Sequence, residues 1–200
     1  MSKNALHLFS PPARSLIQRA TEDMATDITY RNAFERLWDD KSSQIISNGK
    51  SDHASALLSV FLTKAEKRVV IFCKELNKSV YDDECVLSAL EQAISNQVEL
   101  IVYVQNNPEP DSKFAARLTA ASLLPNNRIT FQKELPESVR NLPMNFAYVD
   151  ERAYRFEQNN GTMEAVASAN NPTTVSLLKQ LFTRLTDSIR HASAVSHGNS

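Results

Sequence analysis

Between residues 53 and 131, stretches with helical apolar spacing alternate with short continuous apolar runs, and this alternation constrains the fold more than any other feature. The helical spacing occurs in residues 53–66, 81–96 and 111–123, and the apolar runs are residues 69–73, 98–104 and 128–131. Such runs are typical of strands that are covered on both faces. Strands separated by helices pair in parallel through helical crossovers, so this region predicts an α/β sheet.

The last part of the chain has a different pattern. Residues 145–150 and 152–157 alternate with period two around a turn at Asp150 and Glu151, and residues 163–168 form a third short run. These segments predict a hairpin that extends into a meander, followed by a helix that begins at Pro172. Helical apolar stripes also run from Leu16 to Ile45. We therefore predict a helical N-terminal extension over 1–48, an α/β domain over 49–192 and a disordered tail over 193–200.

Composition excludes several functional classes. The net charge is -1 and the pI is near 6.4, which excludes a globally basic protein that coats nucleic acid. The three glycines are too far apart for the glycine-rich phosphate loops of dinucleotide-binding and P-loop proteins. No apolar run is long enough to span a membrane, and the first residues lack the apolar region of a secretory signal. The two cysteines lack metal-site spacing. We expect a cytoplasmic protein without a cofactor or a metal.

Two segments resemble the phospholipase D-like superfamily. The first lies between Leu57 and Gln105 and contains KRVVIFCKEL and DDECVLSALEQAISNQVELIVYVQ, and the second is MNFAYVDERAYRFEQ followed by EAVASANNP. The resemblance implies a mixed sheet flanked by helices and a signature HxKxxxxD, in which the histidine attacks phosphorus and the lysine neutralises a phosphate oxygen. Two copies of the signature face each other, and chains with one copy dimerise, so the resemblance also implies a homodimer.

The catalytic residues of this signature are missing. When Asp150 takes the acidic position, the lysine position is Asn145 and the histidine position is Pro143. Proline offers no nucleophile, and a neutral asparagine makes no charge-assisted contact with phosphate. The chain contains no HxK, since none of its four histidines is followed two residues later by a lysine: His7, His53, His191 and His197. The sequence therefore predicts a member without the family's phosphodiester chemistry.

The resemblance implies a cleft that has kept its frame and lost its catalytic groups. Its candidate binding residues are Asn145, Asp150, Arg155, Glu157, Ser168 and Asn170. Several of them have a structural alternative. Asp150 suits a turn, and Arg155 and Glu157 share one face of a strand that we interpret as solvated. The asparagines before Pro172 suit a helix N-cap, with Asn171 the preferred residue.

Other residues have two interpretations. The aromatic residues of the meander either stack on bases or, the preferred interpretation, lie in the core: Phe146, Tyr148, Tyr154 and Phe156. Five basic residues form either a phosphate-binding surface or, preferably, a solvated face: Arg128, Lys133, Arg140, Arg152 and Arg155. Asp82, Asp83 and Glu84 bind a cation or, preferably, stabilise a helix start. Cys73 is expected to be buried, and Trp38 either packs on the domain or mediates self-association.

Three functional hypotheses follow. The first is a non-catalytic phospholipase D-like binding or regulatory protein that recognises a macromolecular partner or nucleic acid, or a phosphorylated small molecule, through a homodimeric cleft. The alternative is an active metal-dependent phosphodiesterase or nuclease with a rebuilt acidic site that uses Asp82, Asp83, Asp150 or Glu157. The third is an accessory factor of a mobile element or an antiviral system that recognises another macromolecule.

Overall fold

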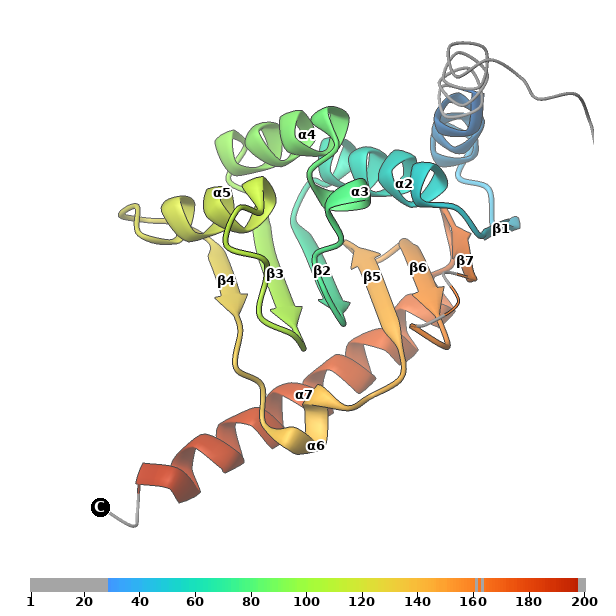
Figure 1. Ribbon diagram of the computed structural model, residues 1–200. Coiled ribbons are helices and arrows are strands. Elements are labelled where there is room, and N and C mark those ends of the chain that lie inside the picture. Colours follow the sequence, from blue (N-terminus) through green and yellow to red (C-terminus); the bar gives the residue numbers. More distant parts are fainter. Residues whose placement is uncertain (1–28, 161, 163, 198–200) are drawn as a thin grey trace, which may run out of the picture.

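A mixed sheet forms the centre of the molecule (Figure 1). The computed structural model describes residues 29–160, 162 and 164–197. In these residues seven strands form one sheet in the order β1-β7-β6-β5-β2-β3-β4. The strands are β1 (Ile45–Asn48), β2 (Arg68–Cys73), β3 (Glu99–Val104), β4 (Ile129–Gln132), β5 (Asn145–Val149), β6 (Ala153–Glu157) and β7 (Ala165–Ser168). β2, β3 and β4 are parallel, whereas β5, β6, β7 and β1 continue the sheet in antiparallel pairs. The parallel part and the meander are both as the sequence predicts.

Helices cover both faces of the sheet (Figure 1). The helices are α2 (Ser51–Lys64), α3 (Lys78–Tyr81), α4 (Glu84–Ser95), α5 (Lys113–Ser122), α6 (Glu137–Arg140) and α7 (Pro172–His197). Val69 and Ile71 of β2 pack into the apolar cluster that contains α2 and α4, and Val70 and Phe72 pack into the cluster that contains α7. β2 therefore needs apolar residues on both faces, which explains its continuous apolar run.

The aromatic residues of the meander belong to the core. Phe146, Tyr148 and Tyr154 are buried in the cluster beneath α7, and Phe156 packs against the same cluster. The Phe182 ring of α7 lies 6.4 Å from the Phe146 and Tyr148 rings. Residues at period two on a covered strand face are expected to pack in this way. The preferred interpretation of these aromatics as core residues is confirmed.

The N-terminal region contributes a strand to the sheet. Residues 29–39 are helical, but residues 45–48 form β1, which pairs with β7. The prediction that Ile45 continues a helical stripe is wrong, because the sheet offers β1 an unpaired edge and pairing outweighs local spacing. The sheet thus crosses the predicted boundary at residue 48, and the earlier part of the predicted extension, residues 1–28, lies outside the described residues.

Trp38 fixes the helical residues 29–39 to the domain. Its ring lies 6.3 Å from the Phe61 ring of α2, and the Arg152 guanidinium lies 4.4 Å above it. Arg152 Nη2 also donates to the Trp38 carbonyl at 2.6 Å. A cation over an indole ring is favourable, especially when it is partly desolvated. Of the two interpretations of Trp38, packing on the domain is confirmed.

The terminal helix is longer than predicted. α7 ends at His197, five residues into the segment 193–200 that was predicted to be disordered. Alanines at 192 and 194 favour a helix, and no glycine or proline interrupts it before Gly198.

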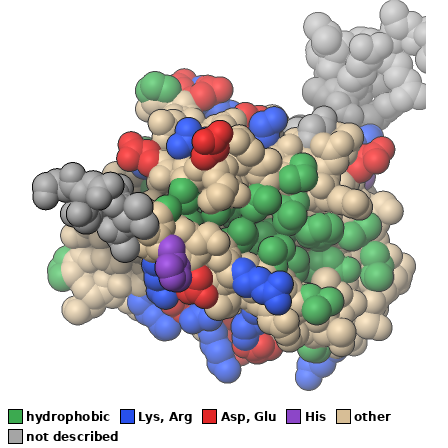
Figure 2. All heavy atoms as spheres, turned by 90° about the horizontal axis from the view of Figure 1, so that it is seen from below, with side chains coloured by type: hydrophobic (Ala, Val, Ile, Leu, Met, Phe, Trp, Pro, Cys, Tyr) green, Lys and Arg blue, Asp and Glu red, His purple; other side chains and the backbone are tan. Residues whose placement is uncertain are grey.

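Leu177 on this helix is 61% exposed. Seen from below relative to Figure 1, the surface shows hydrophobic side chains gathered near its middle (Figure 2). None of the helices in the described part of the chain is long and apolar enough to cross a membrane.

Candidate functional site

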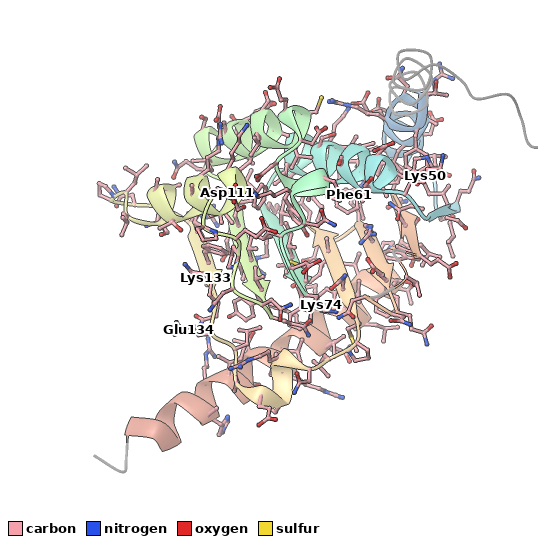
Figure 3. All side chains as sticks on the ribbon, in the orientation of Figure 1. Lys50, Phe61, Lys74, Asp111, Lys133 and Glu134 are labelled. Carbon is pink, nitrogen blue, oxygen red and sulfur yellow. The ribbon has the colours of Figure 1, made fainter. Side chains whose placement is uncertain are left out.

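A pocket with a cavity volume of about 90 Å³ lies where β2 ends and β5 begins. Its floor is formed by Asn145 and Ala147 of β5 and by Arg155 and Glu157 of β6. α2 covers the floor with Ser51, Ala54, Leu58 and Phe61, and the segment between β2 and α4 forms a further wall. Lys50 lies at the start of α2 and Lys74 at the lower end of β2 (Figure 3).

The register of the sheet explains the shape of the floor. Glu157 pairs with Asn145 of β5 and with Ala165 of β7. Arg155 pairs with Ala147 on one side and Ala167 on the other. The small alanine side chains beside Arg155 and Glu157 leave space above the sheet, and residues two apart on a strand point to the same face. The sequence therefore places one arginine and one glutamate side by side on a floor of small residues.

Arg155 and Glu157 form a buried ion pair. Arg155 Nη1 donates to Glu157 Oε2 at 3.1 Å, and Nη2 donates to Asn48 Oδ1 at 3.2 Å. Their side chains are only 17% and 5% exposed. The two residues do share a strand face, as predicted, but the prediction that this face is solvated is wrong. α2 covers the face, and no local pattern in β6 could reveal this.

Tyr30 closes the same region from the helical residues 29–39. Its ring stacks on the His53 ring with centroids 3.9 Å apart, and its hydroxyl donates to the Ser47 carbonyl at 3.2 Å. Burial raises the pKa of Tyr30 to about 12, and the positive charge of Arg155 partly opposes this shift. Tyr30 therefore keeps its proton at neutral pH and remains a hydrogen-bond donor to β1.

Two buried nitrogen atoms at the ion pair have no hydrogen-bond partner among the described residues, namely Asn48 Nδ2 and Arg155 Nε. Both are N–H donors. Buried polar atoms without a partner are rare and call for an explanation such as a bound ion, a ligand or a water. The cluster of Asn48, Arg155 and Glu157 thus has N–H donors that no acceptor of the described residues satisfies.

The charged lining of the pocket has an excess of one positive charge. Lys50, Lys74 and Arg155 face two acidic residues, Glu75 and Glu157. α2 also begins here, with Lys50 as an N-cap residue whose side chain makes no capping hydrogen bond. The N-terminal end of a helix carries a partial positive charge. The pocket is therefore suited to a ligand with acceptor atoms and negative charge.

Asn145, which the sequence resemblance assigns to the lysine position of the signature, lines this pocket, and Pro143 lies two residues before it. Asn145 Oδ1 accepts from the Lys74 backbone N–H at 2.7 Å, and the Pro143 carbonyl accepts from the Asn160 N–H at 2.7 Å. Both groups hold strand ends together. Among the histidine side chains that the structure describes, His53 stacks on Tyr30 and His191 Nδ1 lies 2.6 Å from the Asp187 carbonyl on α7, and neither lines the pocket.

The six candidate cleft residues do not form one site. Asn145, Arg155 and Glu157 meet at the pocket, but Asp150, Ser168 and Asn170 lie toward the opposite end of the sheet. Asn145 and Asp150 are five residues apart along an extended strand, a separation of about 17 Å. The six residues therefore do not line one cleft, and only Asn145, Arg155 and Glu157 belong to the pocket.

The other half of the candidate cleft has structural roles. Asp150 accepts hydrogen bonds from the backbone N–H groups of Glu66, Lys67 and Arg68 at 3.1, 2.9 and 2.8 Å. Asn170 Nδ2 donates to the Lys41 carbonyl at 2.8 Å, and Ser168 Oγ accepts from the Asn170 N–H at 3.4 Å.

Asn171 begins the terminal helix. Its Oδ1 accepts from the Thr174 N–H at 3.0 Å, three residues into α7. This is the geometry of an N-cap. Asn171 is therefore confirmed as the cap residue that the sequence favours.

The acidic residues of the alternative hypothesis are not gathered into a metal site. Asp83 caps α4 by accepting from the Cys85 N–H at 2.8 Å. Asp82 accepts from the Lys113 and Phe114 N–H groups at 3.0 and 2.9 Å at the start of α5. Their preferred role at helix starts is confirmed, and Asp82 serves a different helix from the one expected. Within the described residues, no group of three histidine, cysteine, aspartate or glutamate side chains could hold a metal ion.

The five basic residues beyond the third strand do not form one surface. Arg152 packs on Trp38, and Arg155 is buried at the pocket. Arg140 Nε and Nη2 both donate to the Leu135 carbonyl. Three residues of the pocket region, Asn48, Lys50 and Lys74, were not among the predicted site residues. Lys74 directly follows the apolar run of β2, and ligands of α/β sheets bind at the carboxyl ends of such strands, so the sequence carried a signal for it.

The two cysteines should differ sharply in reactivity. Cys73 is buried beside the pocket and burial raises the pKa of its thiol to about 12, whereas Cys85 is exposed. Since only the thiolate reacts, iodoacetamide at pH 8 should label one cysteine of the native protein, and mass spectrometry of peptides should find it at Cys85. The variant Cys85→Ser should remain unlabelled until it is denatured. Labelling of Cys73 at the rate of Cys85 in native protein would contradict this burial.

Comparison with known proteins places the chain in a family. Residues 50–195 match the model of a domain of unknown function, DUF7931. The chain belongs to this family. The DUF7931 region includes the pocket residues from Lys50 onward and every element from α2 to most of α7. No curated protein matches the sequence.

Three solved structures share the fold of this DUF7931 protein. Nuc, a phospholipase D family member from Salmonella typhimurium, is 10% identical with a TM-score of 0.51, over 72% of this chain and 93% of Nuc. NucT from Helicobacter pylori is 13% identical with a TM-score of 0.51, over 72% of this chain and 98% of NucT. TrmBL2, an archaeal chromatin protein with a novel mode of DNA binding, is 11% identical with a TM-score of 0.51, over 86% of this chain and 64% of TrmBL2.

At these identities the likeness shows the fold alone. The predicted fold, a phospholipase D-like mixed sheet flanked by helices, is confirmed.

Proposed function

We propose that this DUF7931 protein is a non-catalytic binding module that recognises nucleic acid at the pocket between α2, β2 and β5. The proposal is supported by the two residues that the sequence resemblance assigns to the family's histidine and lysine positions. Pro143 and Asn145 stand there, and their polar groups hold the ends of the strands together. The pocket beside Asn145 has a partly buried arginine and two lysines in its lining.

Two further points support nucleic acid as the ligand. The excess of positive charge lies at the pocket in a protein whose net charge is -1, so the attraction for phosphate is local. TrmBL2, which shares the fold, is itself described as binding DNA.

Binding and turnover can be measured on the same samples. Fluorescence anisotropy with short single-stranded DNA, RNA and duplex DNA should show binding that weakens as salt increases. Lys50→Gln/Lys74→Gln should bind more weakly, with a salt slope smaller by about 0.7 for each phosphate of a single strand that the variant no longer neutralises. The matched control, Lys113→Gln/Lys133→Gln, changes two exposed lysines outside the pocket and should bind as the wild type does.

The turnover assay separates this proposal from the metal-dependent alternative. DNA, RNA and model phosphodiesters should remain intact with and without divalent metal ions. Hydrolysis that requires a metal and disappears in Glu157→Gln would establish the alternative enzyme and overturn the non-catalytic proposal.

The homodimer is part of the proposal and has its own test. The fold family builds its cleft from two facing motifs, so a second copy would complete the pocket of the first. Sedimentation of the full chain should show a dimer, and a monomer at every concentration would remove this part. A role as an accessory factor of a mobile element or antiviral system stays a prediction.

A further inference from the structure

We infer that the pocket receives a terminal phosphate, a phosphomonoester, in preference to an internal phosphodiester. This inference builds on the proposed function by naming the chemical group that the site recognises. It starts from the pair of charged residues on the floor, because any group that enters the pocket must satisfy both of them.

The floor offers donors and an acceptor side by side. Arg155 has five N–H donors, of which one contacts Glu157 and one contacts Asn48, while Nε finds no partner in the part of the chain that the structure describes. A glutamate carboxylate such as that of Glu157 can accept hydrogen bonds but cannot donate one. A group that contacts both must therefore accept from the guanidinium and donate to the carboxylate.

A phosphomonoester meets both requirements. As a monoanion it carries oxygen acceptors and one P–OH donor, and its second pKa is near 6, so a proton is available to share with a carboxylate near neutral pH. An internal phosphodiester has acceptors and no O–H. Its oxygens would face the Glu157 carboxylate with no proton between them, which is repulsive in a partly desolvated site.

The volume of the cavity agrees with a compact group. A water molecule takes a share of about 30 Å³, and a cavity that holds benzene measures about 150 Å³. The pocket measures about 90 Å³, which is room enough for a phosphate group. The nucleotide that carries the phosphate would remain at the mouth, where Lys50 and Lys74 can neutralise the next phosphate along the strand.

Matched ligands test the inference on the unmodified full chain. We would measure affinities for one single-stranded oligonucleotide with a 5′-phosphate, with a 3′-phosphate and with hydroxyl groups at both ends, together with a nucleoside monophosphate and inorganic phosphate. At least one phosphorylated end should bind tenfold or more tightly than the hydroxyl form, and the nucleoside monophosphate should compete for the same site. The phosphate effect should persist in Lys113→Gln/Lys133→Gln.

The outcomes separate the inference from the function on which it builds. Equal affinity for phosphorylated and hydroxyl ends would overturn the inference and leave the proposed function intact. Binding of the monophosphate and inorganic phosphate without any oligonucleotide would support the terminal-phosphate site and overturn nucleic acid as its source. Binding of none of the five ligands, and of neither RNA nor duplex DNA, would overturn both.

Variants at the floor add a check within the site. Glu157→Gln keeps a similar shape but can also donate, so it should reduce the preference for a phosphomonoester over a diester at least threefold. Circular dichroism must first show that the variant folds. If it does not, the affinities of the unmodified chain for the phosphorylated and hydroxyl oligonucleotides provide the test. A folded Glu157→Gln with unchanged preference would contradict the shared proton.

Discussion

Replacing Glu157 by leucine is expected to lower the free energy of unfolding by about 3–5 kcal/mol, which is the typical cost of removing one partner of a buried ion pair. The Glu157 side chain is only 5% exposed and bonds to Arg155 at 3.1 Å. Without it, the guanidinium keeps its charge among alanines and the neutral Asn48 amide. Urea unfolding monitored by circular dichroism would measure the change.

A double variant distinguishes the ion pair from simple packing. Arg155→Met/Glu157→Leu removes both charges and fills similar volumes, so it should be substantially more stable than either single variant. Nearby residues that interact show coupling of about 0.5–3 kcal/mol in such a cycle. A single Glu157→Leu variant within about 0.5 kcal/mol of the wild type would show that the pair is solvated, as the alternating sequence first suggested.

The elements of the fold could be predicted where one residue pattern determines burial. The continuous apolar run of β2 indicates a strand covered on both faces, and the alternating pattern of β5 and β6 indicates a hairpin. Both elements could therefore be predicted from the sequence. β1 has only four residues, two of them polar, and exists because β7 offers it an edge. No local pattern specifies such a strand, since its stability comes from a partner more than a hundred residues away.

The candidate site shows the same division. The period of two correctly places Arg155 and Glu157 on one strand face. Whether that face is exposed to solvent depends on α2, which is distant in sequence. The motif spacing grouped Asn145 with Asp150, but the strand geometry separates them, because Asn145 begins the five-residue strand β5 and Asp150 follows its end. Spacing in a motif is therefore a weaker guide to proximity than the length of the element that carries it.

Replacing Asp150 by alanine is expected to destabilise the protein by about 2–4 kcal/mol, since three backbone N–H groups lose a charged acceptor. Asp150 also has a φ of 51°, a left-handed conformation that aspartate and asparagine tolerate better than alanine. Asp150→Asn keeps one oxygen and this tolerance, so it should lose about half as much. Thermal or urea unfolding of the two variants would measure both effects.

The same variant tests where the binding site lies. Asp150 is about 17 Å from Asn145, so Asp150→Ala that is still folded at low temperature should bind the phosphorylated oligonucleotide within twofold of the wild type. A folded Asp150→Ala that fails to bind would mean that both ends of β5 serve one ligand, as a single cleft requires. Unchanged binding together with reduced stability would assign Asp150 to the fold and confine recognition to the end of the sheet that holds Arg155.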